Sequence, residues 1–200
     1  TNYASFGLQS LEIAGESFMP IGYGGGISNI DEMREIFYSG VEKISLNSAA
    51  ISHPQLVEKA ASQFGSQSIV VSMDVKRHRT GKYEVCSERG KKATGVDPAK
   101  FAIQMQKMGA GEILVNSIDR DGTMKGYDLD LIKMVTSAVD IPVIALGGAG
   151  KLQDFDLAVQ MGGASAVAAG SMFVFYGEYR AVLISYPSHR ELRERVYDRQ

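Results

Sequence analysis

The sequence has little of several residues that would mark particular classes of protein. Its 200 residues contain one cysteine, Cys86, which excludes an internal disulfide and a zinc site built from several cysteines. No apolar run approaches the roughly 18–20 residues that a membrane helix needs. The N-terminus also lacks the basic segment followed by an apolar stretch that is typical of a signal peptide. We therefore expect a cytoplasmic protein that does not bind a membrane.

An excess of charge of one sign is lacking as well. Lys and Arg together number 21 and Asp and Glu 23, which gives a net charge of −2 at pH 7 with neutral histidine. This balance gives no electrostatic reason to expect nucleic acid or an anionic membrane as a partner. The three histidines, His53, His78 and His189, lie far apart, so no two have the spacing of metal ligands. We expect neither a metal site nor a cofactor.

Glycine is abundant where proline is scarce. The chain has 22 glycines against 5 prolines, and the glycines occur in tight clusters. Such clusters favour loops in which the backbone approaches a ligand closely, rather than a disordered linker.

Short apolar segments alternate with segments of helical period along the chain. The apolar segments predict strands buried on both sides in a parallel sheet. The predicted strands are Phe18–Tyr23, Lys43–Leu46, Ser68–Met73, Glu112–Ile118, Ile141–Ala145 and Ala164–Ala169. The predicted helices are Asn29–Ser39, Pro54–Phe64, Asp97–Met108, Asp128–Ala138 and Leu152–Met161. This regular alternation predicts an α/β fold with right-handed crossovers, as a single domain over residues 1–200.

One segment, Lys76–Thr94, interrupts the alternation. Its residues Tyr83–Cys86 alternate like a strand, so we expect a hairpin inserted after the strand that ends at Asp74. The basic side chains of the segment are Lys76, Arg77, Arg79, Lys82, Arg89, Lys91 and Lys92. These charges belong either to a solvated loop or to a surface that contacts a ligand.

Four features recur at one constant offset, which is the distance from residue 24 to residue 147. The matched features are Gly24-Gly25-Gly26 with Gly147-Gly148-Ala149, Asp31 with Asp154, Gly40 with Gly163, and Asn47-Ser48 with Gly170-Ser171. Each copy has the order strand, glycine-rich turn, helix, glycine, strand, small polar pair. The pattern predicts two related halves of a (βα)8 TIM barrel. Ordinary turn chemistry, which favours glycine in any case, is the alternative.

The repeated turns also have a chemistry of their own. Glycine turns expose backbone N–H groups, and a neighbouring helix N-terminus with a serine hydroxyl completes a site for phosphate. Two copies predict two phosphate sites at opposite sides of the barrel mouth, and therefore a bis-phosphorylated ligand. The first would use Gly25, Gly26, Asn47 and Ser48, and the second Gly148, Ala149, Gly170 and Ser171.

Several segments together resemble one protein family. They are Gly24–Ile27, Lys43–Ala50, Phe64–Gln67, Val70–Lys76, Gly109–Leu114, Ser117–Thr123, Gly126–Asp128 and Gly147–Gly150. This set resembles the cyclase subunit of imidazole glycerol phosphate synthase, the HisF family. The run from Gly109 to Asp128 is the most specific part, and the order of the segments argues against the sister isomerase of the histidine pathway.

The resemblance implies a (βα)8 barrel that takes ammonia from a glutaminase partner of the HisH type. The ammonia would convert a bis-phosphorylated phosphoribulosyl-formimino ribonucleotide to imidazole glycerol phosphate and an aminoimidazole carboxamide ribonucleotide. Asp74 matches one of two strand-end aspartates that act as acid and base, although a loop-capping role is the alternative. Asp121 and Gly122 match residues near a phosphate, with turn chemistry as the alternative.

Lys43 and Glu112 match two of four charged residues that ring the ammonia entrance in this family. A structural ion pair that closes the bottom of the barrel is the alternative.

The sequence also departs from the family. The other catalytic aspartate lies on the family's first strand, and the first strand predicted here takes the third position. We therefore expect strands 1 and 2 to be absent, with roughly 50 residues missing from a barrel of about 250. A chain that is truly this short would not be expected to catalyse the reaction.

The C-terminal residues resemble a HisF-like branch associated with surface-polysaccharide genes. The matching residues are 166–171, 173–175 and 179–187. That branch is thought to supply ammonia for amidation of a sugar. Three functions therefore remain: the histidine-pathway cyclase, an ammonia-delivering subunit for sugar amidation, and a non-catalytic ammonia conduit or scaffold.

Overall fold

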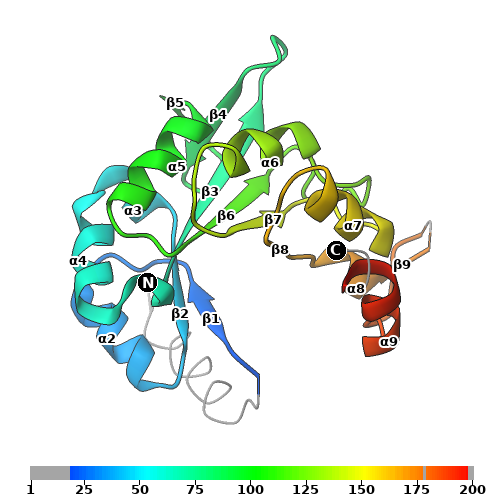
Figure 1. The fold of residues 1–200 in the computed structure, drawn as a ribbon, viewed down its shortest axis with the longest axis horizontal. Helices are drawn as coiled ribbons and strands as arrows, with labels where there is room; N and C mark the ends of the chain where they lie inside the picture. The colour runs from blue at the N-terminus through cyan, green and yellow to red at the C-terminus, as the bar shows by residue number, and fades with distance from the viewer. Residues whose placement is uncertain (1–18, 178, 198–200) are drawn as a thin grey trace. The chain divides into compact units, whose positions relative to one another are not determined.

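The computed structural model describes residues 19–177 and 179–197 (Figure 1). Phe18, the first residue of the first predicted strand, lies outside this range, as do residues 1–17, and the expectation about barrel strands 1 and 2 stays a prediction. The chain divides into two compact units. Unit 1 combines residues 1–72 with 105–112, and unit 2 combines residues 73–104 with 113–200. The prediction of a single domain stays a prediction.

Unit 1 contains three parallel strands. They are β1 (Gly22–Gly24), β2 (Lys43–Leu46) and the first residues of β3 (Ile69–Arg77). In the register, Gly22 lies opposite Lys43 and Ile44 opposite Ile69. The connecting elements are α2 (Ile30–Tyr38), α3 (Ser48–Ser52), α4 (Gln55–Phe64) and the 3-10 turn η1 (Ser66–Ser68).

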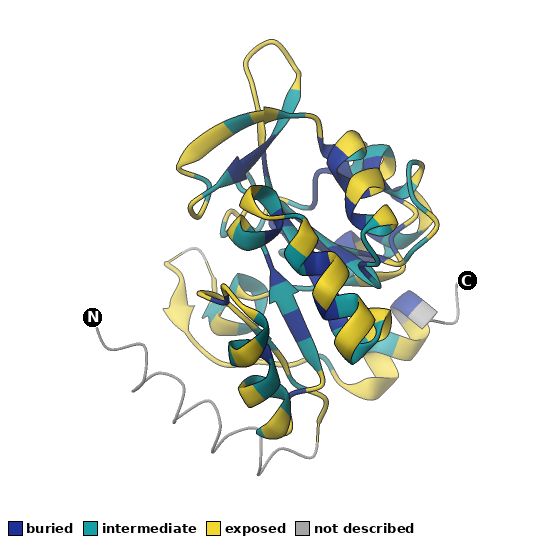
Figure 2. Cartoon of the chain, turned by 90° about the vertical axis from the view of Figure 1, so that its left-hand side faces the viewer, coloured by how far each residue is buried: buried dark blue, intermediate teal, exposed yellow. Residues whose placement is uncertain are grey.

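The helices of unit 1 begin and end where the local chemistry predicts. The side chain of Asn29 accepts a hydrogen bond from the backbone N–H of Glu32 and thereby caps α2. Gly65, with a φ of 87°, ends α4 in a conformation that glycine adopts readily. The buried residues of these helices lie on one side, and the other side is exposed, which Figure 2 shows as dark blue and yellow faces.

Unit 2 contains the rest of β3 and the strands β6 (Glu112–Ser117), β7 (Val143–Leu146) and β8 (Ala166–Val167) in parallel order, except that Glu112, the first residue of β6, belongs to unit 1. An antiparallel pair, β4 (Tyr83–Ser87) and β5 (Lys92–Val96), extends from β3, so the inserted hairpin is confirmed. The helices are α5 (Pro98–Lys107), which continues into unit 1, α6 (Leu129–Thr136) and α7 (Leu152–Gln160).

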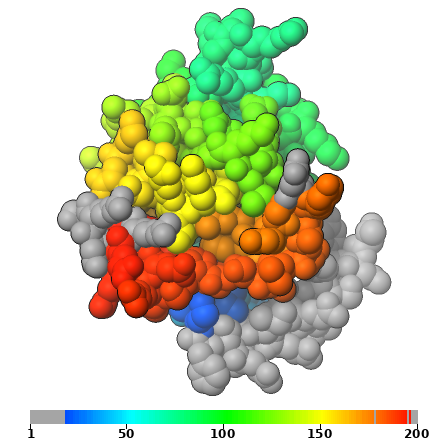
Figure 3. Space-filling model, turned by 90° about the vertical axis from the view of Figure 1, so that its right-hand side faces the viewer, coloured from blue at the N-terminus to red at the C-terminus, as the bar shows by residue number. Residues whose placement is uncertain are grey.

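The C-terminal part of unit 2 departs from the simple alternation. It consists of α8 (Ser171–Val174), the short antiparallel pair β9 (Phe175–Tyr176) and β10 (Ala181–Val182), α9 (His189–Leu192) and the π-helical turn η2 (Arg193–Tyr197). Figure 3 shows this segment, orange to red, beside the yellow α7. The sequence pattern predicted neither the β9–β10 hairpin nor the short helix α3.

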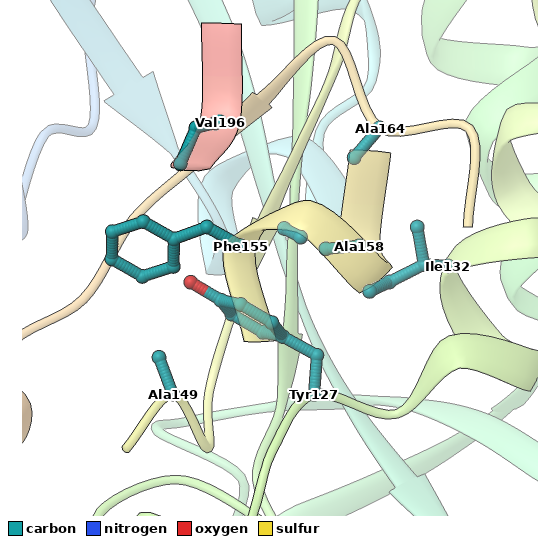
Figure 4. Packing of buried hydrophobic residues seen from close by; sticks show 8 residues of the cluster. Tyr127, Ile132, Ala149, Phe155, Ala158, Ala164 and Val196 are labelled. Carbon is teal, nitrogen blue, oxygen red and sulfur yellow. The ribbon is translucent and has the colours of Figure 1, made fainter. Parts of the chain in front are cut away.

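The core of unit 2 includes a cluster around two aromatic rings (Figure 4). The ring centroids of Tyr127 and Phe155 are 6.4 Å apart. The Tyr127 hydroxyl donates to the backbone oxygen of Ala168 over 2.9 Å, and burial raises the pKa of this phenol. Val196 from η2 is buried in the same cluster, which fixes the C-terminal turn against α7.

The six parallel strands and their helices confirm the (βα)8-barrel fold class. Two details of the prediction are wrong. Alternate residues of β2, β6 and β7 are only half-buried, whereas burial on both faces was expected. The last strand has two residues instead of six, because only Ala166 and Val167 align with β7 in a regular parallel register within the described part of the chain.

The repeated segments share their backbone conformation at some equivalent positions. Gly25 and Gly148 have φ values of 119° and 112°, which are left-handed conformations. Asn47 and Gly170, each of which precedes a short helix, have φ values of −118° and −119°. At neighbouring positions the copies differ, because Gly147 and Gly26 have positive φ values while their partners Gly24 and Ala149 do not, so the structure agrees with the predicted repeat only in part.

Candidate functional site

Asp74 lies on β3, half-buried, and its carboxylate is held by a neighbouring strand. Its Oδ1 accepts a hydrogen bond from Nδ2 of Asn116 on β6, over 2.9 Å. The strand does not end at Asp74 as expected but continues to Arg77, because the residues from Asp74 to Arg77 pair with β4. The carboxylate is therefore fixed by two strands and not by a loop.

Asn116 was missed by the sequence analysis. Its Oδ1 is buried and has no hydrogen-bond partner in the part of the chain that the structure describes. An unpaired buried acceptor costs about 1–3 kcal/mol, and such costs are usually retained for a functional reason. Gly147 makes room for this oxygen, since a Cβ there would lie 2.7 Å from it. The sequence did contain one signal for Asn116, because this polar residue directly follows the apolar residues 113–115 of the strand.

The surroundings of Asp74 on the hairpin side include a buried thiol. Cys86 lies opposite Asp74 in the β3–β4 register. Burial raises the pKa of this thiol, and the carboxylates of Glu84, Asp74 and Asp119 raise it further against an opposing effect of Lys76. A thiol of this kind stays protonated and is a weak nucleophile.

The inserted hairpin uses part of its charge in internal contacts. His78 Nε2 contacts Glu84 Oε2 at 2.5 Å, and the Arg77 guanidinium lies 5.4 Å from the centre of the Tyr83 ring. Arg77 also donates its backbone N–H to Asp119 over 2.7 Å. These contacts anchor the base of the hairpin, and a ligand-binding role for its other basic residues stays a prediction.

Tyr83 joins this hairpin to the start of α6. Its hydroxyl donates to Asp128 Oδ1 over 2.8 Å, and the same carboxylate caps α6 by accepting the backbone N–H of Leu131. Burial, followed by the Asp128 hydrogen bond and charge, raises the pKa of Tyr83 to about 12.

The second predicted phosphate site forms a small hollow of about 10 Å³ within unit 2. The residues that line it are Asp121, Gly122, Leu146, Gly147, Gly148, Ala149, Ala168, Ala169, Gly170 and Ser171. The structure therefore brings together all six residues of unit 2 that were predicted to bind phosphate. We call this hollow the C-terminal cradle.

Close backbone packing explains two glycines of the C-terminal cradle, Gly147 and Gly148. The carbonyl of Gly148 accepts the backbone N–H of Gly126 over 2.8 Å. A Cβ on Gly148 would lie 2.3 Å from the Gly126 oxygen. Asp154 supports the same turn, because its Oδ2 accepts the backbone N–H groups of Gly150 and Lys151. Its repeat partner Asp31 instead pairs with Arg34 at the surface.

The first predicted phosphate site lies in unit 1, and we call it the N-terminal cradle. Gly25 and Gly26 follow β1, and Asn47 and Ser48 follow β2, which pairs with β1 in parallel. Parallel pairing brings both turns to the same edge of the sheet. The Asn47 Oδ1 is buried without a hydrogen-bond partner among the described residues. The four predicted residues thus share one location, and anion binding there stays a prediction.

Lys43 and Glu112 form an ion pair within unit 1. Lys43 Nζ donates to Glu112 Oε1, and the two residues open β2 and β6 respectively. Their side chains are 41% and 20% exposed, so the pair is partly open to solvent. The two charges are in contact, and whether they form part of an ammonia entrance or only a structural ion pair stays a prediction.

Comparison with known proteins identifies the family. Residues 9–180 match the family of histidine biosynthesis proteins. The "Putative imidazole glycerol phosphate synthase subunit hisF2" of Pseudomonas aeruginosa is 48% identical over 181 residues, which cover 90% of this chain and 72% of the relative. The chain belongs to the HisF family.

Two further HisF relatives agree. The "Imidazole glycerol phosphate synthase subunit HisF" of Alkaliphilus metalliredigens is 48% identical over 158 residues, covering 79% of this chain and 63% of the relative. The "Putative imidazole glycerol phosphate synthase subunit HisF" of Leptospira interrogans is 45% identical over 186 residues, which cover 92% of this chain and 73% of the relative. The chain thus spans 63% to 73% of the length of these HisF proteins.

Two further properties bear on the chemistry open to this HisF chain. Within residues 19–177 and 179–197, no three His, Cys, Asp or Glu side chains are grouped to hold a metal ion. No helix in the same ranges is long and apolar enough to cross a membrane.

Proposed function

We propose that the chain carries the cyclase activity of imidazole glycerol phosphate synthase. In this proposal a bis-phosphorylated phosphoribulosyl-formimino ribonucleotide reacts with ammonia to give imidazole glycerol phosphate and an aminoimidazole carboxamide ribonucleotide. The observation that carries the proposal is the Asp74 carboxylate, held by Asn116 over 2.9 Å between β3 and β6, of which β6 leads to Asp121 and Gly122 of the C-terminal cradle. The HisF relatives support the same reaction class.

The chain's own residues have distinct parts in this reaction. A fixed carboxylate accepts a proton from the ammonia nitrogen as it bonds to carbon, and general base catalysis of this kind typically contributes 10²–10⁴-fold in rate. Asn116 holds the Asp74 oxygen that it contacts, so the other carboxylate oxygen is left for the reacting nitrogen. Each cradle binds one phosphate of the substrate through backbone N–H groups and a serine hydroxyl.

The proposal includes a partner of the HisH glutaminase type, which releases ammonia from glutamine in the cytoplasm. Lys43 and Glu112 open two parallel strands, so they mark the strand edge opposite the glycine turns. Ammonia entering at that edge would pass the Lys43–Glu112 pair. Neither nucleic acid nor a membrane has a part in this function.

The test uses the full-length protein with the bis-phosphorylated ribonucleotide and ammonium salts. NMR of the reaction mixture should show loss of the formimino proton and the appearance of imidazole ring protons. Addition of glutamine and a cognate glutaminase should replace the ammonium requirement. The proposal fails if the full-length protein binds the ribonucleotide but does not turn it over under either condition.

Delivery of ammonia for amidation of a polysaccharide sugar is the second candidate. The β9–β10 hairpin favours it, since its residues are those that resemble the surface-polysaccharide branch. This candidate predicts that ammonia reaches a separate amidotransferase while the ribonucleotide is not converted. A non-catalytic conduit predicts, in addition, that Asp74→Asn has no effect on any activity.

A further inference from the structure

Arg180 directly precedes β10 in the β9–β10 hairpin, and its backbone conformation is unusual. Arg180 has a φ of 51°, in the left-handed region that residues other than glycine seldom occupy. Left-handed backbone costs such a residue about 1–2 kcal/mol. Strain of this kind persists where surrounding contacts hold it, and it often marks a functional position.

Two contacts hold the Arg180 side chain in place. Its Nη1 donates to the backbone oxygen of Gly122 over 3.0 Å. Its guanidinium carbon lies 4.5 Å from the centre of the Phe175 ring on β9, which is a cation–π arrangement. The guanidinium carries five N–H donors in a rigid fork, and the Gly122 contact uses one of them.

The C-terminal cradle needs a cation that its lining does not provide. The residues that line the hollow include the acidic residue Asp121 and no basic residue. A phosphate monoester carries about −1.5 to −2 charges near pH 7, so it would meet backbone amides, the Ser171 hydroxyl and one negative charge. Binding of phosphate beside Asp121 is unfavourable unless a positive charge lies close by.

We propose that Arg180 is this cation, and that the β9–β10 hairpin completes the C-terminal cradle for a phosphate monoester. The inference rests on the proposed function, which places a phosphate in the cradle. Gly122 lines the hollow and is the residue that Arg180 touches, so the guanidinium lies at the rim. Arg120 also lies near this cradle, since its Cβ is 3.0 Å from the position that a Cβ on Gly148 would take, but its Nη1 donates to the Gly126 oxygen and the residue lines a neighbouring hollow with Lys125 and Asp128.

Arg180 also links the hairpin to specificity. Phosphate affinity at the C-terminal cradle then depends on the β9–β10 hairpin, which carries Arg180 and which an ordinary βα connection does not have. The planar fork of arginine can form two parallel hydrogen bonds to phosphate or to carboxylate oxygens, and the larger negative charge of phosphate favours it over a monovalent carboxylate ligand.

The test is a titration of the ¹⁵N-labelled full-length protein with inorganic phosphate, followed through backbone amide shifts. Gly122, Gly148 and Gly170 report on the C-terminal cradle, and Gly25 and Gly26 report on the N-terminal cradle. Arg180→Ala should weaken phosphate binding at the first group of amides by about tenfold or more, and leave the second group unchanged.

Arg190→Ala is the matched control, since Arg190 is exposed, belongs to the same C-terminal segment and pairs with Glu194 rather than with the cradle. Arg180→Lys keeps the charge but loses the fork and the stacking, so an intermediate affinity is expected. A charge contact also predicts that the advantage of the wild type over Arg180→Ala shrinks as salt is raised. A purely structural clamp on Gly122 would leave that advantage independent of salt.

The outcomes separate the two proposals. If the wild type shows no phosphate-induced shifts at either cradle, the proposed function fails and Arg180 has no anion to bind. If the wild type responds and Arg180→Ala titrates like Arg190→Ala, the inference about Arg180 is overturned while the proposed function stands. Should Arg180→Ala fail to fold, as its amide dispersion would show, Arg180→Lys and Arg180→Gln give the same comparison.

Discussion

The side-chain amide of Asn116 donates a hydrogen bond to the carboxylate of Asp74, with Nδ2 and Oδ1 2.9 Å apart on adjacent strands of unit 2. This orientation leaves the amide oxygen of Asn116 buried without a partner among the described residues. The reverse orientation would place two oxygens against each other. The Asn116 side chain therefore gives up one hydrogen bond in order to hold Asp74.

Asn116→Leu should separate activity from stability. Leucine has a similar size and removes the unpaired acceptor, so the free energy of unfolding should stay within about 1 kcal/mol of the wild type or rise. Loss of the contact to Asp74 should lower kcat by about a hundredfold, because small displacements of a catalytic group have effects of that size. Urea unfolding and steady-state kinetics with ammonium measure the two quantities.

Ser117→Ala is the control for this variant, since Ser117 is the next residue along β6, is buried and points to the other face of the strand. Its kcat should match the wild type. A double variant with Asp74→Asn completes the comparison. If Asn116 acts through Asp74, Asn116→Leu should add little in that background, and an undiminished effect there would contradict the role given to Asn116.

Asp74→Asn should abolish turnover while substrate binding is retained. The amide keeps the size of the carboxylate and removes proton transfer, so the rate should fall by about 10²–10⁴-fold. The dissociation constant of the bis-phosphorylated substrate, measured by calorimetry, should change little, because the phosphates bind elsewhere. Equal turnover in the variant and the wild type would remove Asp74 from the mechanism and favour the conduit.

Tyr83 should titrate near pH 12 instead of near 10. Because burial and Asp128 raise the pKa of Tyr83, the folded protein holds this proton more tightly than the unfolded chain. The resulting stabilisation is complete below pH 10 and is lost as the pH rises from 10 through 12. The difference in ultraviolet absorbance between the wild type and Tyr83→Phe, recorded against pH, should show one phenol that ionises in this range.

Tyr83→Phe also removes the hydrogen bond to Asp128. The variant should unfold with a free energy lower by about 1 kcal/mol at neutral pH, since Asp128 keeps its capping bond to Leu131. A Tyr83 step close to pH 10 would show that the phenol is not held by Asp128 in solution.

The sequence predicted those parts of the molecule that depend on periodicity and turn chemistry. The strand Lys43–Leu46 was predicted with its observed bounds, and the helix predicted to start at Asn29 does begin directly after that residue, which caps it. The C-terminal cradle was predicted because glycine turns after parallel strands leave backbone N–H groups open to an anion. These features are local, so the residues involved carry the information themselves.

The features that were missed depend on contacts between distant residues. Asn116 is recognisable only when Asp74 is beside it, and 42 positions separate the two in sequence. The β9–β10 hairpin has strands of two residues, which are too short for an alternation to show. Arg180 is recognised as a candidate phosphate ligand only through its contact with Gly122, which lies 58 positions away in sequence.

Gly148→Ala should destabilise the C-terminal cradle strongly. The φ of Gly148 is 112°, and an added Cβ would lie 2.3 Å from the Gly126 oxygen, so both the backbone and the packing resist the change. We expect a loss of about 2–3 kcal/mol in the free energy of unfolding. Gly170→Ala is the matched control in the same cradle, because its φ is −119° and no atom lies within 4 Å of the added Cβ. Similar unfolding curves for the two variants would contradict the packing argument.

Lys43→Ala distinguishes an ammonia gate from a structural ion pair. A gate predicts that glutamine-dependent turnover, measured with a cognate glutaminase, changes much more than turnover with ammonium salts, because free ammonia reaches the site from solvent. The ion pair is partly exposed, so its loss should cost only about 0–1 kcal/mol of stability. Lys59→Ala, which removes a charge from the exposed side of α4 in the same unit, controls for the change in net charge. If both activities of Lys43→Ala fall together and the melting temperature falls with them, Lys43 and Glu112 have a structural role at the start of their strands and the gate is excluded.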